Sequence, residues 1–206
     1  MTDYEMMTEG GYRLDEAVSA LQKEIRRCHE KEALYWALEV NSKFPDYLWK
    51  RLVVIVTEDI GMANVELVNT ITNLSARVIN LRKESKRKDY DLCILGFAIL
   101  AMARSKKSRE GDDYVNQILR ERRLGWRLEV PDYAKDKHTK AGRAMGKTAI
   151  DFWTEGSKLE NEAFPSQYIG WVDGLGDGYY DGNCKPAVST KTKFMQDNLF
   201  NYGEND

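Results

Sequence analysis

The chain has 206 residues, of which 42% are hydrophobic and 31% charged, and its formal net charge is −2. This composition is ordinary for a globular protein, and the length suffices for one domain with a core, with or without a small appendage. The nearly balanced charge excludes a global field that would draw the chain onto nucleic acid or membrane, so any DNA contact requires a local basic patch.

The cysteines and the apolar runs indicate the compartment. Cys28, Cys93 and Cys184 form no CxxC pair, which argues against a disulfide framework or a zinc site and favours a reducing environment. The N-terminus lacks the layout of a signal peptide, and the longest apolar run, Cys93 to Ala103, is too short to span a bilayer. We therefore expect a cytoplasmic protein without a membrane segment.

The first part of the chain predicts three helices. Apolar residues at alternating spacings of four and three predict one stripe of an amphipathic helix: Leu14, Val18, Leu21, Ile25 and Cys28. Residues 33–40 predict a short second helix. Pro45 and Asp46 are a start signal for a third helix over residues 47–59, which Gly61 ends.

The middle of the chain predicts three more helices. Asn64 can cap a fourth helix, whose apolar positions run from Val65 to Leu81, and residues 83–91 form a charged helix end or loop. Residues 92–102 are apolar nearly all round, which predicts a central buried helix. A sixth helix, capped by Asp112 or Asp113, extends to residue 123 and directs four apolar side chains inward: Tyr114, Val115, Ile118 and Leu119.

The C-terminal part predicts less regular structure. Pro131 interrupts the helical pattern, and a last helix is expected over residues 143–159. Five glycines between Gly170 and Gly182 predict a loop, and the polar tail from Asn183 is expected to be poorly ordered. The prediction is an all-α helical bundle over residues 1–123, an irregular extension packed on it over 124–182, and a tail over 183–206.

Three blocks of the sequence carry a resemblance to a known family: DEAVSALQKEIR at residues 15–26, ALYW at 33–36 and YLWKRLVVIVTEDIGMA at 47–63. In this order they resemble the helical C-terminal region of the RarA/MgsA family of clamp-loader-like AAA+ ATPases. A weaker block covers residues 101–114, although the proline that the family places before Lys-Ser is absent at residues 104–108. The ATPase module with its Walker motifs is not found upstream of these blocks.

The resemblance implies an all-α collar domain that self-associates, typically into tetramers. It implies no catalytic residues and no cofactor, because the chemistry of that family lies in the ATPase module. It also suggests partners: a RarA-type ATPase reached through collar contacts, or single-stranded DNA-binding protein.

A basic segment is a candidate site for a phosphate backbone. It contains six cationic or titratable side chains: Lys135, Lys137, His138, Lys140, Arg143 and Lys147. Nearby aromatic residues could stack on bases. The alternative is a solvated face on which His138 bonds to a carboxylate such as Asp136. With only two histidines in the chain, a histidine-based metal site is not expected.

Residues 141–148 (AGRAMGKT) satisfy the loose pattern of a phosphate loop. That mechanism needs a buried strand before the loop and a helix after it. The preceding residues, 133–140, are polar. The pattern therefore favours a glycine-containing basic turn that leads into a helix over a nucleotide site.

The third helix carries two acidic candidates for an interface. Glu58 and Asp59 lie near its C-terminal end, where negative charge is unfavourable, so we expect a compensating cation such as Lys50 or Arg51. A structural salt bridge or a contact between subunits is favoured over a paired-carboxylate acid–base site.

Aromatic residues gather around the junction of the second and third helices. They pack either in the core or at an interface with a subunit or partner, where aromatic residues are enriched. The group comprises Tyr35, Trp36, Tyr47 and Trp49.

The leading hypothesis is a non-enzymatic oligomerisation protein linked to DNA replication or repair, with a homotetramer as the expected state. A protein that binds nucleic acid directly through residues 135–147 is the alternative. A nucleotide-binding enzyme that uses residues 146–148 is a weaker one.

Overall fold

The protein, described by a computed structural model over residues 6–84 and 90–164, divides into two compact units, residues 1–126 and 127–206. Apart from an isolated bridge between Met7 and Arg13, the described residues form helices and connecting turns. The prediction of an all-α fold is confirmed. The expected glycine loop at 170–182 and the tail from 183 lie outside the described residues, and none of the described helices is long and apolar enough to cross a membrane.

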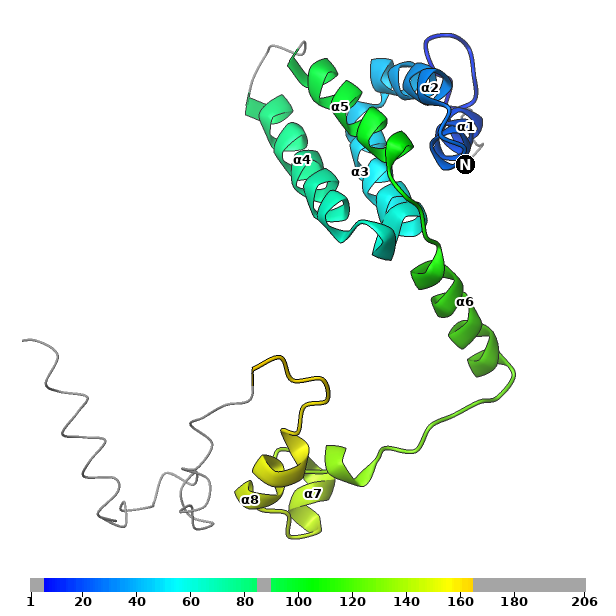
Figure 1. Ribbon diagram of the computed structural model, residues 1–206. Coiled ribbons are helices and arrows are strands. Elements are labelled where there is room, and N and C mark those ends of the chain that lie inside the picture. Colours follow the sequence, from blue (N-terminus) through cyan, green and yellow to red (C-terminus); the bar gives the residue numbers. More distant parts are fainter. Residues whose placement is uncertain (1–5, 85–89, 165–206) are drawn as a thin grey trace, which may run out of the picture. The chain divides into compact units, whose positions relative to one another are not determined.

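The first unit consists of six α-helices and two short turns of other helix types (Figure 1). The helices run in the order α1 (Leu14–Arg26), α2 (Glu30–Lys43), α3 (Pro45–Ile55), α4 (Val65–Glu84), α5 (Tyr90–Arg104) and α6 (Glu110–Arg123). A π-helical turn, η1 (Val56–Ile60), and a 3₁₀ turn, η2 (Gly61–Ala63), connect α3 to α4.

The core of the first unit lies among helices α1 to α5. Its largest fully buried side chains include Leu21, Ile25, Leu48, Trp49, Leu52, Ile71, Leu95, Ile99 and Met102. The predicted stripe of α1 is confirmed from Leu14 to Ile25. Its last member, Cys28, was predicted wrongly, because α1 ends before it and the residue is exposed with a φ of 62°.

The turn between α3 and α4 follows the sequence signals. Gly61 adopts a φ of +44° and the carbonyl oxygen of Ser108 would lie 3.3 Å from a Cβ there, so a side chain at this position would be strained and crowded. Asn64 caps α4 as predicted, because its side-chain oxygen accepts a hydrogen bond of 3.0 Å from the backbone N–H of Leu67.

Helix α5 packs in the core along one side and is exposed along the other. Leu95, Ala98, Ile99 and Met102 are buried, but Leu92 and Phe97 are 46% and 55% exposed. The prediction of a helix buried all round was therefore wrong for one of its faces. An apolar helix can bury one side and leave the other open when no element of the described chain covers it.

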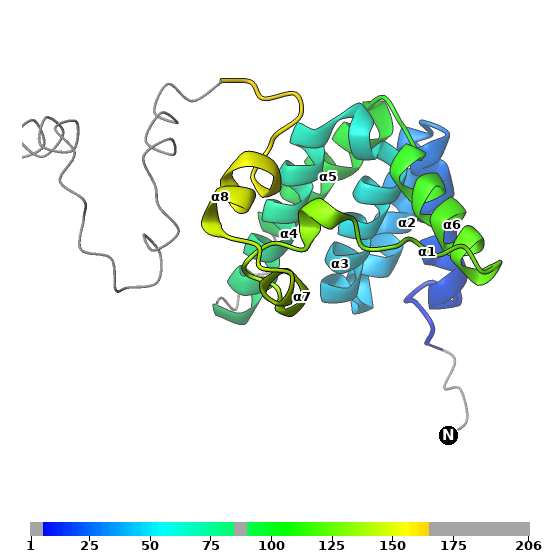
Figure 2. The same cartoon turned by 90° about the horizontal axis from the view of Figure 1, so that it is seen from below.

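Helix α6 projects from the end of the bundle at which η1 and η2 lie (Figure 1), and Figure 2 views the bundle helices side by side from that end. It begins at Glu110, so the predicted cap at Asp112 or Asp113 was wrong. No residue of α6 is buried, and Tyr114 and Val115 are 63% and 57% exposed. The predicted inward direction of its apolar stripe was also wrong, because none of the helices that the structure describes buries it.

The second unit contains short helical turns instead of the long helix predicted over residues 143–159. These are η3 (Asp132–Ala134), α7 (Lys140–Ala144), α8 (Ala149–Asp151) and the π-helical turn η4 (Phe152–Gly156). Gly146, with a φ of +75°, breaks the path after α7. Thr148 then caps α8 in a capping box with Asp151.

Candidate interaction surfaces

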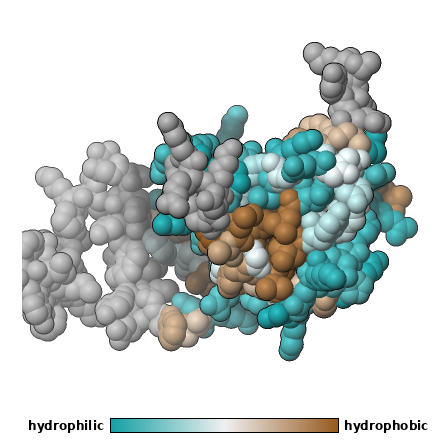
Figure 3. Space-filling view, turned by 90° about the horizontal axis from the view of Figure 1, so that it is seen from above, coloured by the Kyte–Doolittle hydropathy of each residue, from teal (hydrophilic) through white to brown (hydrophobic). Residues whose placement is uncertain are grey.

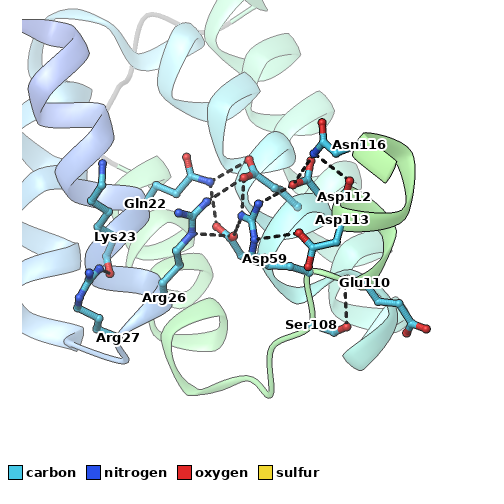
Figure 4. A network of polar contacts seen from close by, with 12 residues as sticks. Gln22, Lys23, Arg26, Arg27, Asp59, Ser108, Glu110, Asp112, Asp113 and Asn116 are labelled. Carbon is cyan, nitrogen blue, oxygen red and sulfur yellow. Dashed lines mark hydrogen bonds and ion pairs between the residues drawn. The ribbon is translucent and has the colours of Figure 1, made fainter. Parts of the chain in front are cut away.

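Glu58 and Asp59 form the centre of a polar network that joins α1, η1 and the start of α6 (Figure 4). From α1, the Arg26 guanidinium donates to Glu58 at 2.8 Å and to Asp59 at 2.7 Å. From the segment before α6, Arg109 donates to the same two carboxylates at 2.7 and 3.0 Å. The two acids therefore have a cation on each side, which compensates the unfavourable charge at the end of α3.

Gln22 extends this network toward α3. Its amide donates to Glu58 at 3.0 Å and to Asp59 at 2.9 Å, and its oxygen accepts a hydrogen bond of 2.7 Å from Arg51. The expected direct pairing with Lys50 or Arg51 was wrong, because Arg51 reaches the acids only through Gln22 and Lys50 is exposed.

The hydrogen bonds and ion pairs of the network stabilise the charged forms of its side chains. Hydrogen bonds from Arg109 and Gln22, together with the charges of Arg26 and Arg109, keep the pKa of Glu58 below its usual value. The bonds to Glu58 and Asp59 raise the pKa of Arg109. Asp59 is 1% exposed and accepts bonds from three side chains. This geometry is that of a structural junction, and it does not favour an acid–base pair, which needs one carboxyl group with a raised pKa.

Sequence reasoning missed three members of the network: Gln22, Arg26 and Arg109. Gln22 and Arg26 are four residues apart and therefore share a face of α1, which was a detectable signal. Arg109 had no such signal, since it lies 50 residues from Asp59 in the chain.

The aromatic group divides between the core and the surface. Trp49 is fully buried and belongs to the core, whereas Tyr35 and Tyr47 are roughly half exposed. Trp36 lies between two tyrosine rings in edge-on contacts, with centroids 5.0 Å from Tyr12 and 5.1 Å from Tyr35. The Tyr35 hydroxyl is bonded to that of Tyr12 at 3.2 Å, and both exposed rings keep an apolar face and a polar tip of the kind that suits a partner surface.

The basic segment of the second unit is bonded largely to itself. His138 contacts Asp136 through Nδ1 at 3.1 Å and through its backbone N–H at 2.9 Å, as the solvated-face alternative predicts. Arg143 donates to the carbonyl oxygens of Lys137 and His138. Lys147 is paired with Asp132 at 2.9 Å.

A hollow of about 330 Å³ lies beside this segment. Its lining combines two lysines with four acids and a tyrosine: Lys135, Lys147, Asp132, Asp136, Asp151, Glu155 and Tyr133. A lining with an excess of carboxylates repels phosphate, so its electrostatics do not favour a nucleic-acid groove. Lys140 is exposed on α7 and stands apart from this lining.

Residues 141–148 form the basic turn that the sequence favoured. They run from α7 through Gly146 to the cap of α8, and the residues before them form turns rather than a strand. Lys147, the residue that would contact phosphates, is bonded to Asp132. Within residues 6–84 and 90–164, no three His, Cys, Asp or Glu side chains are placed to hold a metal ion.

An apolar surface lies at the start of α5. Figure 3 shows a brown patch there, on the face of the first unit seen from above. Exposed α5 residues include Leu92, Cys93 and Phe97. Leu38 on α2 is also exposed, and the last residue of α5, Arg104, is bonded to the first residue of α2, Glu30, at 2.8 Å. Contiguous exposed apolar side chains of this kind mark association surfaces.

These features define a class of protein: an all-α helical domain whose charged groups form a structural junction and whose apolar faces are left open. A family described as the C-terminal region of the MgsA AAA+ ATPase matches residues 28–181. The match covers more than half of the chain, and the chain belongs to that family. The predicted resemblance is confirmed.

A relative of known name supports the same assignment. The "Replication-associated recombination protein A" of Bacillus subtilis (strain 168) is 28% identical to this chain over 162 residues. The aligned region covers 77% of this chain and 34% of that protein, so the chain spans about a third of the length of its relative.

Proposed function

We propose that this chain is a non-catalytic self-assembly module that serves DNA replication or repair in the cytoplasm and that it forms a homotetramer. The link to replication comes from its family and from the name of its Bacillus relative. A RarA-type ATPase and single-stranded DNA-binding protein are the partners that this relation suggests. The three cysteines, which form no CxxC pair in the sequence, fit a reducing compartment.

The exposed apolar face of α5 carries the proposal. Leu92 and Phe97 are about half exposed on a helix that buries Leu95, Ile99 and Met102 in the core. Exposing these side chains to water is costly, and a second copy of the chain can cover them. The carboxylates of Glu58 and Asp59, by contrast, are bonded to Gln22, Arg26 and Arg109, which supports a structural and not a catalytic role for them.

The native mass tests this proposal. Light scattering across a concentration series should give about 95 kDa, four times the 23.8 kDa of the chain. A strict monomer at all concentrations would overturn it.

Two variants test whether the exposed face of α5 is the contact between copies of the chain. Phe97→Lys should weaken association roughly tenfold or more, because it buries a charge in an apolar contact. Asn73→Lys, at an exposed polar position of α4, is the matched control and should leave the mass unchanged. Equal masses for both variants would show that the α5 face is not the contact.

A further inference from the structure

Helix α6 carries an apolar stripe that no described part of the chain buries. The stripe consists of Tyr114, Val115, Ile118 and Leu119, which occupy one side of two successive turns. Tyr114, Val115 and Leu119 are exposed, and Ile118 is partly exposed. Two polar residues outside the stripe bond within the helix: Asn116 to Asp112 at 3.0 Å and Gln117 to Glu121 at 3.0 Å.

The base of α6 is held firmly although its stripe is open. Arg109, the residue before the helix, is bonded to Glu58, Asp59 and Asp112. The backbone N–H of Ser108 also donates to the carbonyl oxygen of Asp59 at 3.0 Å. A 14-residue helix is marginal in water without packing. The network therefore presents the stripe outward, in a position where a partner would stabilise the helix.

The order of charges along α6 points to a second copy of the same helix. The first turn carries Glu110, Asp112 and Asp113, and the last turn carries Arg120, Arg122 and Arg123, with the apolar stripe centred between them. When two such helices pack antiparallel, each acidic turn lies beside the partner's arginine turn. A parallel pair would place like charges together, which is unfavourable.

The stripe has the same two-fold symmetry as the charges. In an antiparallel pair centred between residues 116 and 117, Tyr114 meets Leu119 of the partner helix, and Val115 meets Ile118. Such a contact uses the same patch on both subunits, which is the arrangement of a two-fold interface.

A hollow at the base of the helix fits this register. It measures about 390 Å³ and is lined by Met62, Glu110, Gly111 and Tyr114. Gly111 lies on the same side of α6 as the stripe, and a side chain there would meet nothing within 4 Å. In the antiparallel register, the arginine turn of the partner reaches this hollow, and Glu110 borders it with the opposite charge.

We infer that α6 pairs antiparallel with α6 of a second copy, so that residues 111 and 122 of opposite chains lie side by side. This inference rests on the proposed function, because it names a contact within the assembly. Four apolar side chains per copy bury less than the roughly 1,200 Å² of a specific interface. The α6 pair therefore needs a second contact elsewhere, and two different two-fold contacts together build a closed tetramer.

Disulfide trapping in the full-length chain tests the register. Cys28, Cys93 and Cys184 are first replaced by serine, and Gly111→Cys and Arg122→Cys are made separately. A mixture of the two variants under mild oxidation should give a disulfide-linked dimer, and each variant alone should give none. In the antiparallel pair the two copies of residue 111 are about 16 Å apart, from ~1.5 Å of rise per residue, which exceeds the ~7 Å Cα limit for a disulfide.

The outcomes separate the inference from the proposed function. Trapping of Gly111→Cys alone would indicate parallel helices and overturn the antiparallel pair. A native-size oligomer without any trapped dimer would also overturn it, while leaving self-assembly intact; the stripe would then be covered by another part of the chain or by a different protein. A monomer in light scattering would overturn both.

A lysine substitution on the helix provides a second readout. Val115→Lys places a charge in the stripe and should weaken association roughly tenfold or more. Gln117→Lys introduces the same charge outside the stripe, where it can still bond to Glu121, and should leave the association unchanged. Because α6 contributes no buried residue, both variants should fold, as circular dichroism would check. Equal association of the two would contradict the α6 contact.

Discussion

The two units of the chain are stabilised in different ways. In residues 6–126 the helices α1 to α5 share an apolar interior, and many of its side chains are fully buried. In residues 127–164 the buried residues are only Gly142 and Ala149. The first unit therefore depends on the burial of apolar surface, and the second depends on local bonds between side chains and backbone.

In the second unit, such local bonds determine where the short helices begin and end. The Thr139 hydroxyl accepts a hydrogen bond of 2.9 Å from the N–H of Gly142, which caps α7. The Thr148 hydroxyl accepts one of 3.2 Å from Ile150, and Asp151 bonds back to the N–H of Thr148 at 2.7 Å. Caps of this kind stop and restart helices at fixed residues, and apolar periodicity does not report them.

Removing the central acid of the network should have the largest effect on the first unit. Asp59→Ala removes the buried one of the two carboxylates that Arg26 and Arg109 share, and should cost about 2–4 kcal/mol of the free energy of unfolding, less than a fully buried pair because both arginines are partly exposed. Urea unfolding followed by circular dichroism measures it. Asp113→Ala, whose carboxylate is exposed and 3.9 Å from Arg109, should change stability by less than about 0.5 kcal/mol. A similar loss for both variants would contradict the role of the network.

Two helical glycines, one in each unit, have different surroundings: Gly142 is crowded and Gly111 faces open space. A Cβ at Gly142 would lie 1.8 Å from the carbonyl oxygen of Asp136, so Gly142→Ala should destabilise the second unit by about 1–3 kcal/mol. Gly111 has open space, and Gly111→Ala should stabilise α6 by about 0.5–1 kcal/mol. Limited proteolysis of the two variants measures the effect, with cleavage of Gly142→Ala expected within residues 127–164. Equal resistance of both to proteolysis would contradict the close approach at Gly142.

The sequence predicts the first five helices because apolar residues at helical spacing coincide there with a real core. Leu21 and Ile25 of α1 illustrate this, since both lie on the predicted stripe and both are fully buried. The same signal on α6 led to the wrong direction for Tyr114 and Val115. Periodicity indicates that one face of a helix is apolar, but it does not indicate which element, if any, covers that face.

The partners of the candidate site were harder to predict than its acids. Glu58 and Asp59 stand out because negative charge at the end of a helix needs compensation. Their actual partners, Arg26 and Arg109, come from segments 32 to 51 residues away along the chain. Spacing rules describe neighbours within one helix, so they favoured the nearby Lys50 and Arg51.

Loss of the cap of α8 should have a moderate and local effect. Thr148→Ala removes the hydroxyl that bonds to Ile150 and Asp151 and should cost about 1 kcal/mol of local stability. Hydrogen exchange at the amide of Ile150 measures it, because that amide loses its acceptor. Thr154→Ala is the control, since the Thr154 hydroxyl donates to the carbonyl oxygen of Ile150 in α8 and makes no bond to its amide N–H. Faster exchange in both variants to the same degree would argue against a specific cap.

Acid should weaken the first unit through Glu58, with a smaller effect than Asp59→Ala. The pKa of Glu58 is held below its ordinary value of 4.5 chiefly by its hydrogen bond from Arg109. A carboxyl group whose pKa is lower in the folded state stabilises the fold above its unfolded pKa and loses that contribution as the pH falls through the folded pKa. The difference in unfolding free energy between the wild-type chain and Glu58→Gln should therefore shrink as the pH falls from about 6 to about 3.

The corresponding variant of an exposed acid separates this effect from general acid sensitivity. Glu32→Gln changes a side chain at an exposed position of α2, so its stability should follow that of the wild-type chain at every pH. A constant difference between the wild type and Glu58→Gln across this range would mean that the ion pair with Arg109 contributes no pH-dependent stability.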